Sequence, residues 1–187
     1  MKKKKRLLFL TVGSTSAGNH LVVRILMLMG CIGNDGALPD GVQREFDLWA
    51  QGYSDEVPLY DKVVWWKVVA YQGIFEDLSG YKRRLEENGY EVKTIYVMRN
   101  WTTMIKSARY RHPRRKELEV AFDKALEENI HVLKHISLMQ PLFIMNTSML
   151  FEYPQLVIDR LERFTGLKFP KEGYDKIRME TDSKWGK

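Results

Sequence analysis

Short apolar runs alternate with amphipathic segments along this chain of 187 residues. Runs rich in branched and aromatic side chains predict four buried strands, at Leu7–Val12, Val63–Ala70, Val92–Met98 and Pro141–Asn146. Apolar residues that recur at three- and four-residue spacing predict helices at Asn19–Met29, Glu76–Glu87, about Thr102–Arg111, Arg114–Met139 and Pro154–Phe164. This alternation predicts an α/β fold of three layers, in which helices flank a mainly parallel sheet of four to five strands.

Turn and stop signals separate these elements. Asn88-Gly89 and Gly166 follow predicted helices and are typical helix ends, and Asn100 is a candidate helix cap. Glycine and proline punctuate the segment Ile32–Pro58, which predicts an irregular lid or acceptor loop. The sequence shows no internal repeat and no second domain boundary. Residues 1–187 are therefore expected to form a single domain, with residues 1–5 as a basic leader.

Composition and charge narrow the class of protein. Hydrophobic residues make up 44% of the sequence, which is typical of a globular chain. The single cysteine, Cys31, excludes an intramolecular disulfide and a cysteine-based zinc site, and it is expected to be a small buried hydrophobe. The basic start at Lys2–Arg6 precedes an apolar run too short for a signal peptide or a membrane span, so a cytoplasmic location is expected. The net charge of +6 favours anionic partners.

The most informative stretch lies between the first predicted strand and the first predicted helix. Its glycines, Gly13 and Gly18, have the spacing of a P-loop. A glycine-bearing loop between a strand and a helix holds phosphate, because loop N–H groups and the helix N-terminus point at the anion. Asn19-His20 stands where nucleotide triphosphatases carry Lys-Ser/Thr. A phosphate site is therefore expected here, without the Walker lysine and without a hydroxyl ligand for Mg²⁺.

A second candidate for anion binding follows the third predicted strand. Arg99 comes at the end of that strand, and Ser107 follows eight residues later on a predicted helix. An arginine fork and a serine hydroxyl at this spacing can converge on one phosphate. Taken alone, an Arg–Ser pair of this kind is a weak signal, because many chains contain one by chance.

Taken together, these stretches resemble the P-loop sulfotransferases, which use 3′-phosphoadenosine-5′-phosphosulfate (PAPS). The segment Ser16–His20 is similar to the family's loop for the 5′-phosphosulfate, and Tyr96–Ser107 is similar to its 3′-phosphate segment, with the Arg-to-Ser spacing intact. Leu28–Gly33 resembles the turn after the family's first helix. Met149–Pro154 and Arg163–Leu167 resemble the C-terminal ending of the family.

The resemblance implies both a ligand and a reaction. PAPS would be bound by two groups of residues, namely Ser14, Thr15, Ser16, Ala17, Gly18, Asn19 and His20 at the first loop, and Arg99 and Ser107 at the second. A sulfuryl group would pass to a hydroxyl or amine of a small-molecule or carbohydrate acceptor, and no metal ion is expected to take part.

Three positions depart from the family pattern. Ser16 stands where the loop normally carries Lys or Arg, which removes a cation that would stabilise the leaving phosphate. Val69 replaces a histidine that closes the second strand in many members. Trp101 replaces a proline, which is tolerable at a helix start.

Four residues are candidates for the chemistry of transfer, which needs a base for the acceptor proton and cations around the leaving phosphate. His20 lies beside the loop and is either a base or an anion-binding donor. Lys67, late in the second predicted strand, is either a functional cation or an ordinary strand residue. Asp47 and Glu45, in the irregular segment, are further candidates for the base.

Several alternatives stay open. The basic cluster Arg109–Lys116 either helps to hold the nucleotide or is a solvated helix junction. His131 and His135 have helical metal-ligand spacing but no evident third ligand. The main alternative to sulfuryl transfer is a nucleotide- or partner-binding protein of the same fold without catalysis. A P-loop kinase is disfavoured by the missing lysine and Mg²⁺ aspartate, and a nucleic-acid-binding module by the lack of a recognition motif.

Overall fold

A parallel sheet of four strands forms the centre of the protein. The computed structural model describes residues 5–14, 17–34, 41–69, 77–100, 102, 136 and 139–176. The strands are β1 (Arg6–Ser14), β2 (Lys62–Val69), β3 (Tyr90–Met98) and β4 (Leu142–Asn146). They lie in the order β2-β1-β3-β4, and every neighbouring pair is parallel. The α/β fold and all four predicted strands are thereby confirmed.

Three of the predicted helices are present and two helices were not predicted. The confirmed helices are α1 (Asn19–Leu28), α3 (Leu78–Glu87) and α7 (Pro154–Thr165). The additional helices are α2 (Gly41–Ala50) and α6 (Thr147–Glu152). The predicted helices at 102–111 and 114–139 fall almost wholly outside the described residues.

The prediction that Ile32–Pro58 is irregular is wrong for its central part, because α2 occupies it. Phe46 and Trp49 lie on one side of this helix and are buried against the sheet. Gly41 precedes that apolar stripe and Gly52 follows it, so these two glycines bound the helix without interrupting it. The burial of two aromatic side chains outweighs the loop-like composition of the segment around them.

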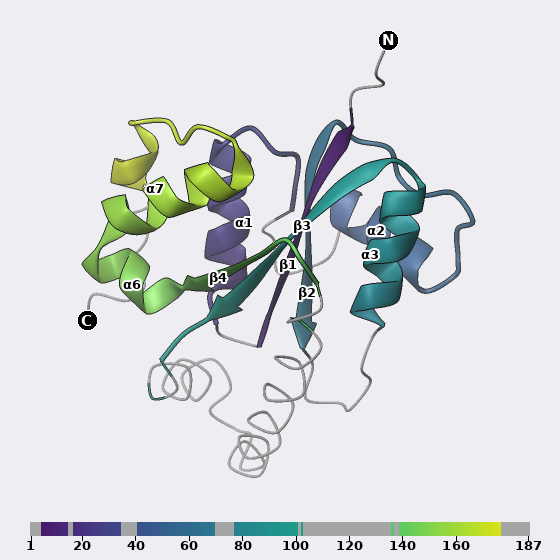
Figure 1. The fold of residues 1–187 in the computed structure, drawn as a ribbon, viewed down its shortest axis with the longest axis horizontal. Coiled ribbons are helices and arrows are strands. Elements are labelled where there is room, and N and C mark those ends of the chain that lie inside the picture. Colours follow the sequence, from purple (N-terminus) through teal and green to yellow (C-terminus); the bar gives the residue numbers. More distant parts are fainter. Residues whose placement is uncertain are drawn as a thin grey trace.

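Helices cover both faces of the sheet (Figure 1). On one face, α1, α6 and α7 pack against alternate strand residues such as Phe9 and Ile95. On the other face, α2 and α3 pack against the intervening residues, including Leu8 and Leu10. Helices cover both faces, which explains why the central strands appear in the sequence as nearly continuous apolar runs rather than alternating ones. Cys31 is buried as expected, and burial raises the pKa of its thiol to about 12.

The outer edge of β2 is covered by other parts of the chain. The Val64 N–H donates to the carbonyl of Ile32 at 2.8 Å. Further along the strand, the side-chain amide of Gln43 accepts from the Trp66 N–H at 3.2 Å and donates to the Trp66 carbonyl at 2.9 Å. The amide of Gln43 thus takes the place of a neighbouring strand, and α2 shields an edge that would otherwise be open to pairing.

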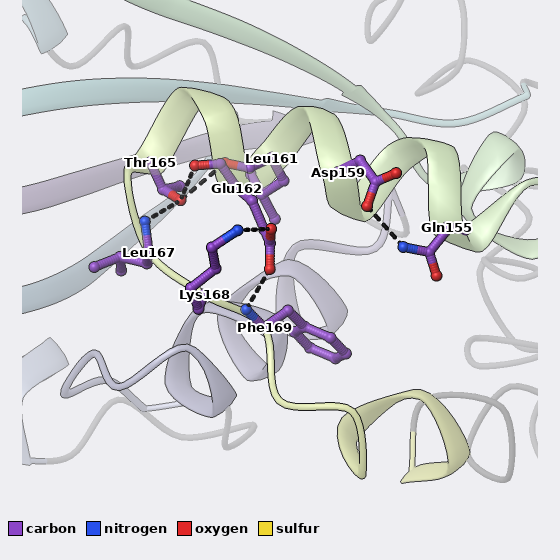
Figure 2. A network of polar contacts seen from close by, with 8 residues as sticks. All are labelled: Gln155, Asp159, Leu161, Glu162, Thr165, Leu167, Lys168 and Phe169. Carbon is purple, nitrogen blue, oxygen red and sulfur yellow. Dashed lines mark hydrogen bonds and ion pairs between the residues drawn. The ribbon is translucent and has the colours of Figure 1, made fainter.

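The end of α7 is fixed by a local network of polar contacts (Figure 2). Glu162 accepts from the Phe169 N–H and from the Lys168 ammonium, both at 2.8 Å. These hydrogen bonds, with that of Lys168 the larger influence, lower the pKa of the Glu162 carboxyl. The Leu167 N–H donates to the Thr165 hydroxyl at 3.1 Å. From β3, Lys93 donates to the Thr165 carbonyl at 3.3 Å, so a strand side chain ties the helix end to the sheet.

Helices in the described ranges are all too short or too polar to cross a lipid bilayer.

Candidate phosphate-binding site

The carboxyl ends of β1 and β3 lie side by side at the point where the chain changes direction across the sheet. After β1 the chain leads to β2 on one side, and after β3 it leads to β4 on the other. Val12 is in register with Tyr96, and Gly13 with Val97. In open parallel sheets, ligands bind in the crevice outside the carboxyl ends at such a switch point. The first loop and Arg99 both start from this position.

The base of the first loop is closed by contacts that require glycine at position 13. A Cβ on Gly13 would collide with Asn19 Oδ1 and would lie 2.7 Å from the Val97 carbonyl oxygen. The Asn19 side chain is buried and its Nδ2 donates to the Gly13 carbonyl at 3.2 Å. One side chain at the start of α1 therefore holds the end of β1.

The other end of the loop also requires glycine. Gly18 precedes α1 with a φ of 104°, which side-chain-bearing residues rarely adopt. A Cβ there would lie 2.9 Å from Thr147 Cγ2. None of the first-turn residues of α1 is acidic. The positive end of the helix dipole consequently faces the loop without a carboxylate of its own helix beside it.

Arg99 follows β3 directly and lies on the α6 side of the sheet. The residue is only 9% exposed, and its Cζ is 5.9 Å from the centre of the Phe151 ring. The next residue, Asn100, receives its support from α6, because its N–H donates to Ser148 Oγ at 3.3 Å. Asn100 Oδ1 accepts from the Thr102 N–H at 3.0 Å, which is the contact expected of a helix cap.

The two catalytic candidates lie on opposite faces of the sheet. His20, in the first turn of α1, lies with its ring centre 4.9 Å from that of Trp66. The Trp66 indole N–H donates to the Asn34 carbonyl at 2.9 Å, which fixes the ring that His20 contacts. Lys67 is on the α2 side, where its Nζ forms a 3.0 Å ion pair with Asp47. The structure therefore places the His20 ring against Trp66 and directs the Lys67 ammonium toward α2.

The two carboxylate candidates have partners within the fold. Asp47 accepts from the Trp65 indole N–H at 3.1 Å as well as from Lys67, and so anchors α2 to β2. Glu45 accepts from the Tyr60 hydroxyl at 2.6 Å. That hydrogen bond raises the pKa of Tyr60 to about 12. Both carboxylates thus hold α2 in place, and they lie on a helix rather than in an irregular segment.

Several predicted site residues lie outside the described part of the chain. These are Thr15 and Ser16 of the loop, Ser107, the cluster Arg109–Lys116, and the pair His131 and His135. Ser14 is described as the last residue of β1. Among the residues that are described, no group of three or more His, Cys, Asp or Glu side chains could hold a metal ion.

Sequence reasoning missed the contribution of α6. Thr147 Oγ1 donates to the Ala17 carbonyl at 2.7 Å, and Ser148 and Phe151 contact the segment at Arg99 and Asn100. A signal was present, since the polar run Asn146-Thr147-Ser148 directly follows a buried strand. In a parallel sheet, such a run lies at the same edge as the other carboxyl ends.

Protein-family models and curated proteins were compared with the sequence, and neither comparison finds a match.

Proposed function

We propose that this chain binds PAPS in the crevice between β1 and β3 and transfers its sulfuryl group to a hydroxyl or amine of a small-molecule or carbohydrate acceptor. One observation carries the proposal. The glycine-bounded loop and Arg99 are far apart in the sequence, yet they lie at adjacent carboxyl ends at the switch point of the sheet. This is where an α/β fold binds an anionic ligand, and it supports the resemblance noted in the sequence.

The described residues suit a ligand with two anionic groups. Gly13 and Gly18 let the ends of the loop pack closely against Asn19, Val97 and Thr147, and the start of α1 favours negative charge. In the proposal, residues 14–20 hold the 5′-phosphosulfate, while Arg99 with Ser107 holds the 3′-phosphate. An arginine suits this task because its planar fork can donate two parallel hydrogen bonds to one phosphate.

The transfer itself is an in-line displacement at sulfur. The acceptor oxygen or nitrogen forms a bond to sulfur, and the bond from sulfur to the bridging oxygen of the 5′-phosphate breaks. PAPS supplies the sulfuryl group, and adenosine 3′,5′-bisphosphate (PAP) leaves with the bonding electron pair. In this proposal His20 takes the acceptor proton, because it is the second residue of α1 and follows the loop directly in the sequence. Lys67 is assigned to holding α2, because its ammonium is paired with Asp47.

A binding titration with the purified chain tests the proposal. PAP at a hundred times its dissociation constant should raise the melting temperature by about 5–10 °C. ADP and ATP–Mg²⁺ serve as controls. Arg99→Met should weaken PAP binding by more than about tenfold while leaving ADP, which lacks a 3′-phosphate, little affected. Arg160→Met is the matched control, because Arg160 is exposed on α7. An unchanged melting temperature with PAP would contradict the proposal.

Formation of PAP from PAPS in the presence of acceptors then tests catalysis. Tight binding of PAP without turnover on a broad panel of acceptors would identify the alternative, a nucleotide- or partner-binding protein of the same fold. The absence of a loop cation at position 16 makes slow turnover the expected result, by a factor on the order of 10²–10³ relative to a loop with Lys or Arg.

A further inference from the structure

A single buried side chain touches both halves of the candidate site. Thr147, the first residue of α6, is 1% exposed. Its hydroxyl oxygen lies 2.7 Å from the Ala17 carbonyl oxygen and 3.3 Å from the Met98 carbonyl oxygen. A hydroxyl has one hydrogen to donate, so Ala17 receives the main bond and Met98 the weaker branch of a three-centre bond. Ala17 belongs to the first loop, and Met98 immediately precedes Arg99.

Other residues of α6 reinforce the same connection. Ser148 Oγ accepts from the Asn100 N–H at 3.3 Å, which holds the residue after Arg99. Phe151 lies one helical turn after Thr147, and its ring centre is 5.9 Å from the Arg99 guanidinium carbon. The Thr147 methyl carbon Cγ2 lies 2.9 Å from the position that a Cβ on Gly18 would take. The short helix α6 therefore contacts the loop at two residues, Ala17 and Gly18, and the arginine segment at three.

From this geometry we infer that Thr147 is a positioning residue that fixes the spacing between the two anion-binding positions. The inference rests on the proposed function, because it assigns one phosphate to the loop and the other to Arg99. Thr147 would then determine specificity for a nucleotide with two separated phosphates over a nucleotide with one.

The physical reason is that only a ligand bound at both positions depends on the distance between them. Once one phosphate is bound, the other group binds at an effective concentration set by how well the second position is placed. A site held at the correct spacing before binding also loses less entropy when the ligand arrives. A ligand with a single phosphate uses one position and is insensitive to the spacing.

Calorimetric titrations of two Thr147 variants with three ligands test this inference. Thr147→Val keeps the shape and the methyl group but removes the hydroxyl, whereas Thr147→Ser keeps the hydroxyl. The ligands are PAP, adenosine 5′-phosphate and adenosine 3′-phosphate. Thr147→Val should weaken PAP by about tenfold and each monophosphate by less than about twofold, whereas Thr147→Ser should keep the preference of the original chain.

The other outcomes separate the inference from the function on which it rests. An equal loss for all three ligands in Thr147→Val would show a merely structural role and overturn the inference, as would no loss at all. A chain with native Thr147 that does not prefer PAP to the monophosphates would overturn the proposed function along with the inference. If Thr147→Val does not fold, Ser148→Ala carries the test. It removes the acceptor for Asn100 and should weaken PAP selectively; an unselective effect overturns the inference.

Discussion

Helices α1 and α3 both begin at the carboxyl edge of the sheet, on opposite faces (Figure 1). Their N-termini differ in capping, because a side chain caps α3 but none caps α1. Helix α3 carries its own anion, because Asp77 Oδ1 accepts from the Gly80 N–H at 2.8 Å. Helix α1 is preceded by Gly18, which has no side chain to cap it, and its first turn contains no acidic residue. The positive end of α3 is neutralised within the chain, whereas that of α1 is placed to receive charge from a ligand.

The same contrast extends to the cations of the two faces. On the α2 and α3 side, Lys67 is paired with the Asp47 carboxylate at 3.0 Å. On the α1 and α6 side, Arg99 lies against an aromatic ring, that of Phe151, and immediately precedes a segment held by Ser148. Of the two cations near the carboxyl ends of the strands, Lys67 holds a helix of its own face, whereas Arg99 lies at the switch point. The difference indicates which face of the edge is built for a ligand.

The strongest test of this contrast gives α1 an anion of its own. Asn19→Asp changes the buried residue at the start of α1 to an isosteric carboxylate beside the loop. The carboxylate would repel a bound phosphate, and it would lose the donor to the Gly13 carbonyl. We expect PAP affinity to fall by about a hundredfold or more, measured by calorimetric titration, with the helix content retained in circular dichroism.

The matched control is Asp77→Asn, the reverse change at α3. Asparagine caps a helix about as well as aspartate, so we expect little loss of stability and no change in PAP affinity. Equal loss of PAP binding in Asp77→Asn and in Asn19→Asp would break the contrast, because the ligand would then not distinguish the two helix starts.

Much of the sheet and of the loop was predictable from local sequence. The central strands β1 and β3 are apolar runs buried largely on both faces, so their positions could be predicted without knowledge of their partners. The two glycine ends of the loop could be predicted, because Gly13 and Gly18 are both required by close approach of backbone and side chains, and glycine is conspicuous in a sequence. The strand-end position of Arg99 followed from the same reasoning.

What sequence could not provide are contacts between distant segments. The helix α2 lies in a glycine- and proline-rich stretch. It is stabilised by packing of Phe46 and Trp49 against the sheet, and local helix propensity carries no information about that packing. Thr147 reaches Ala17 across 130 positions of sequence, so no local spacing indicates its role. The ion pair of Lys67 with Asp47 is likewise a consequence of tertiary structure. It directs the Lys67 ammonium to the α2 face of the sheet.

A second test asks whether the charge of Lys67, on the α2 side, stabilises the fold or takes part in catalysis. Lys67→Met removes the ammonium but leaves Asp47 with the donors of Trp65 and Gln43. The side chains of the pair are 11% and 18% exposed, so we expect a loss of about 1–2 kcal/mol in the free energy of unfolding, measured by urea titration. PAP affinity should stay unchanged.

The control for this test is Lys168→Met, which removes a lysine whose side chain is 89% exposed in its pair with Glu162. It should leave the unfolding midpoint unchanged, since such surface pairs contribute little. If Lys67→Met kept its stability but lost sulfuryl transfer, Lys67 would be assigned to the chemistry instead. Residues from both faces of the sheet would then take part in the reaction.

The smallest expected effect comes from removing the anion that α3 carries. Asp77→Ala leaves the Gly80 N–H without its carboxylate acceptor, which should cost about 1 kcal/mol, or about 2–4 °C in melting temperature. Asp77→Ser should recover most of this loss, because a hydroxyl also accepts from the helix amide. The affinity for PAP should be equal in all three chains. If Asp77→Ala instead created a measurable second site for PAP or inorganic phosphate at α3, an unneutralised helix start would suffice for binding, and the specificity attributed to the β1 loop and Arg99 would have to be given up.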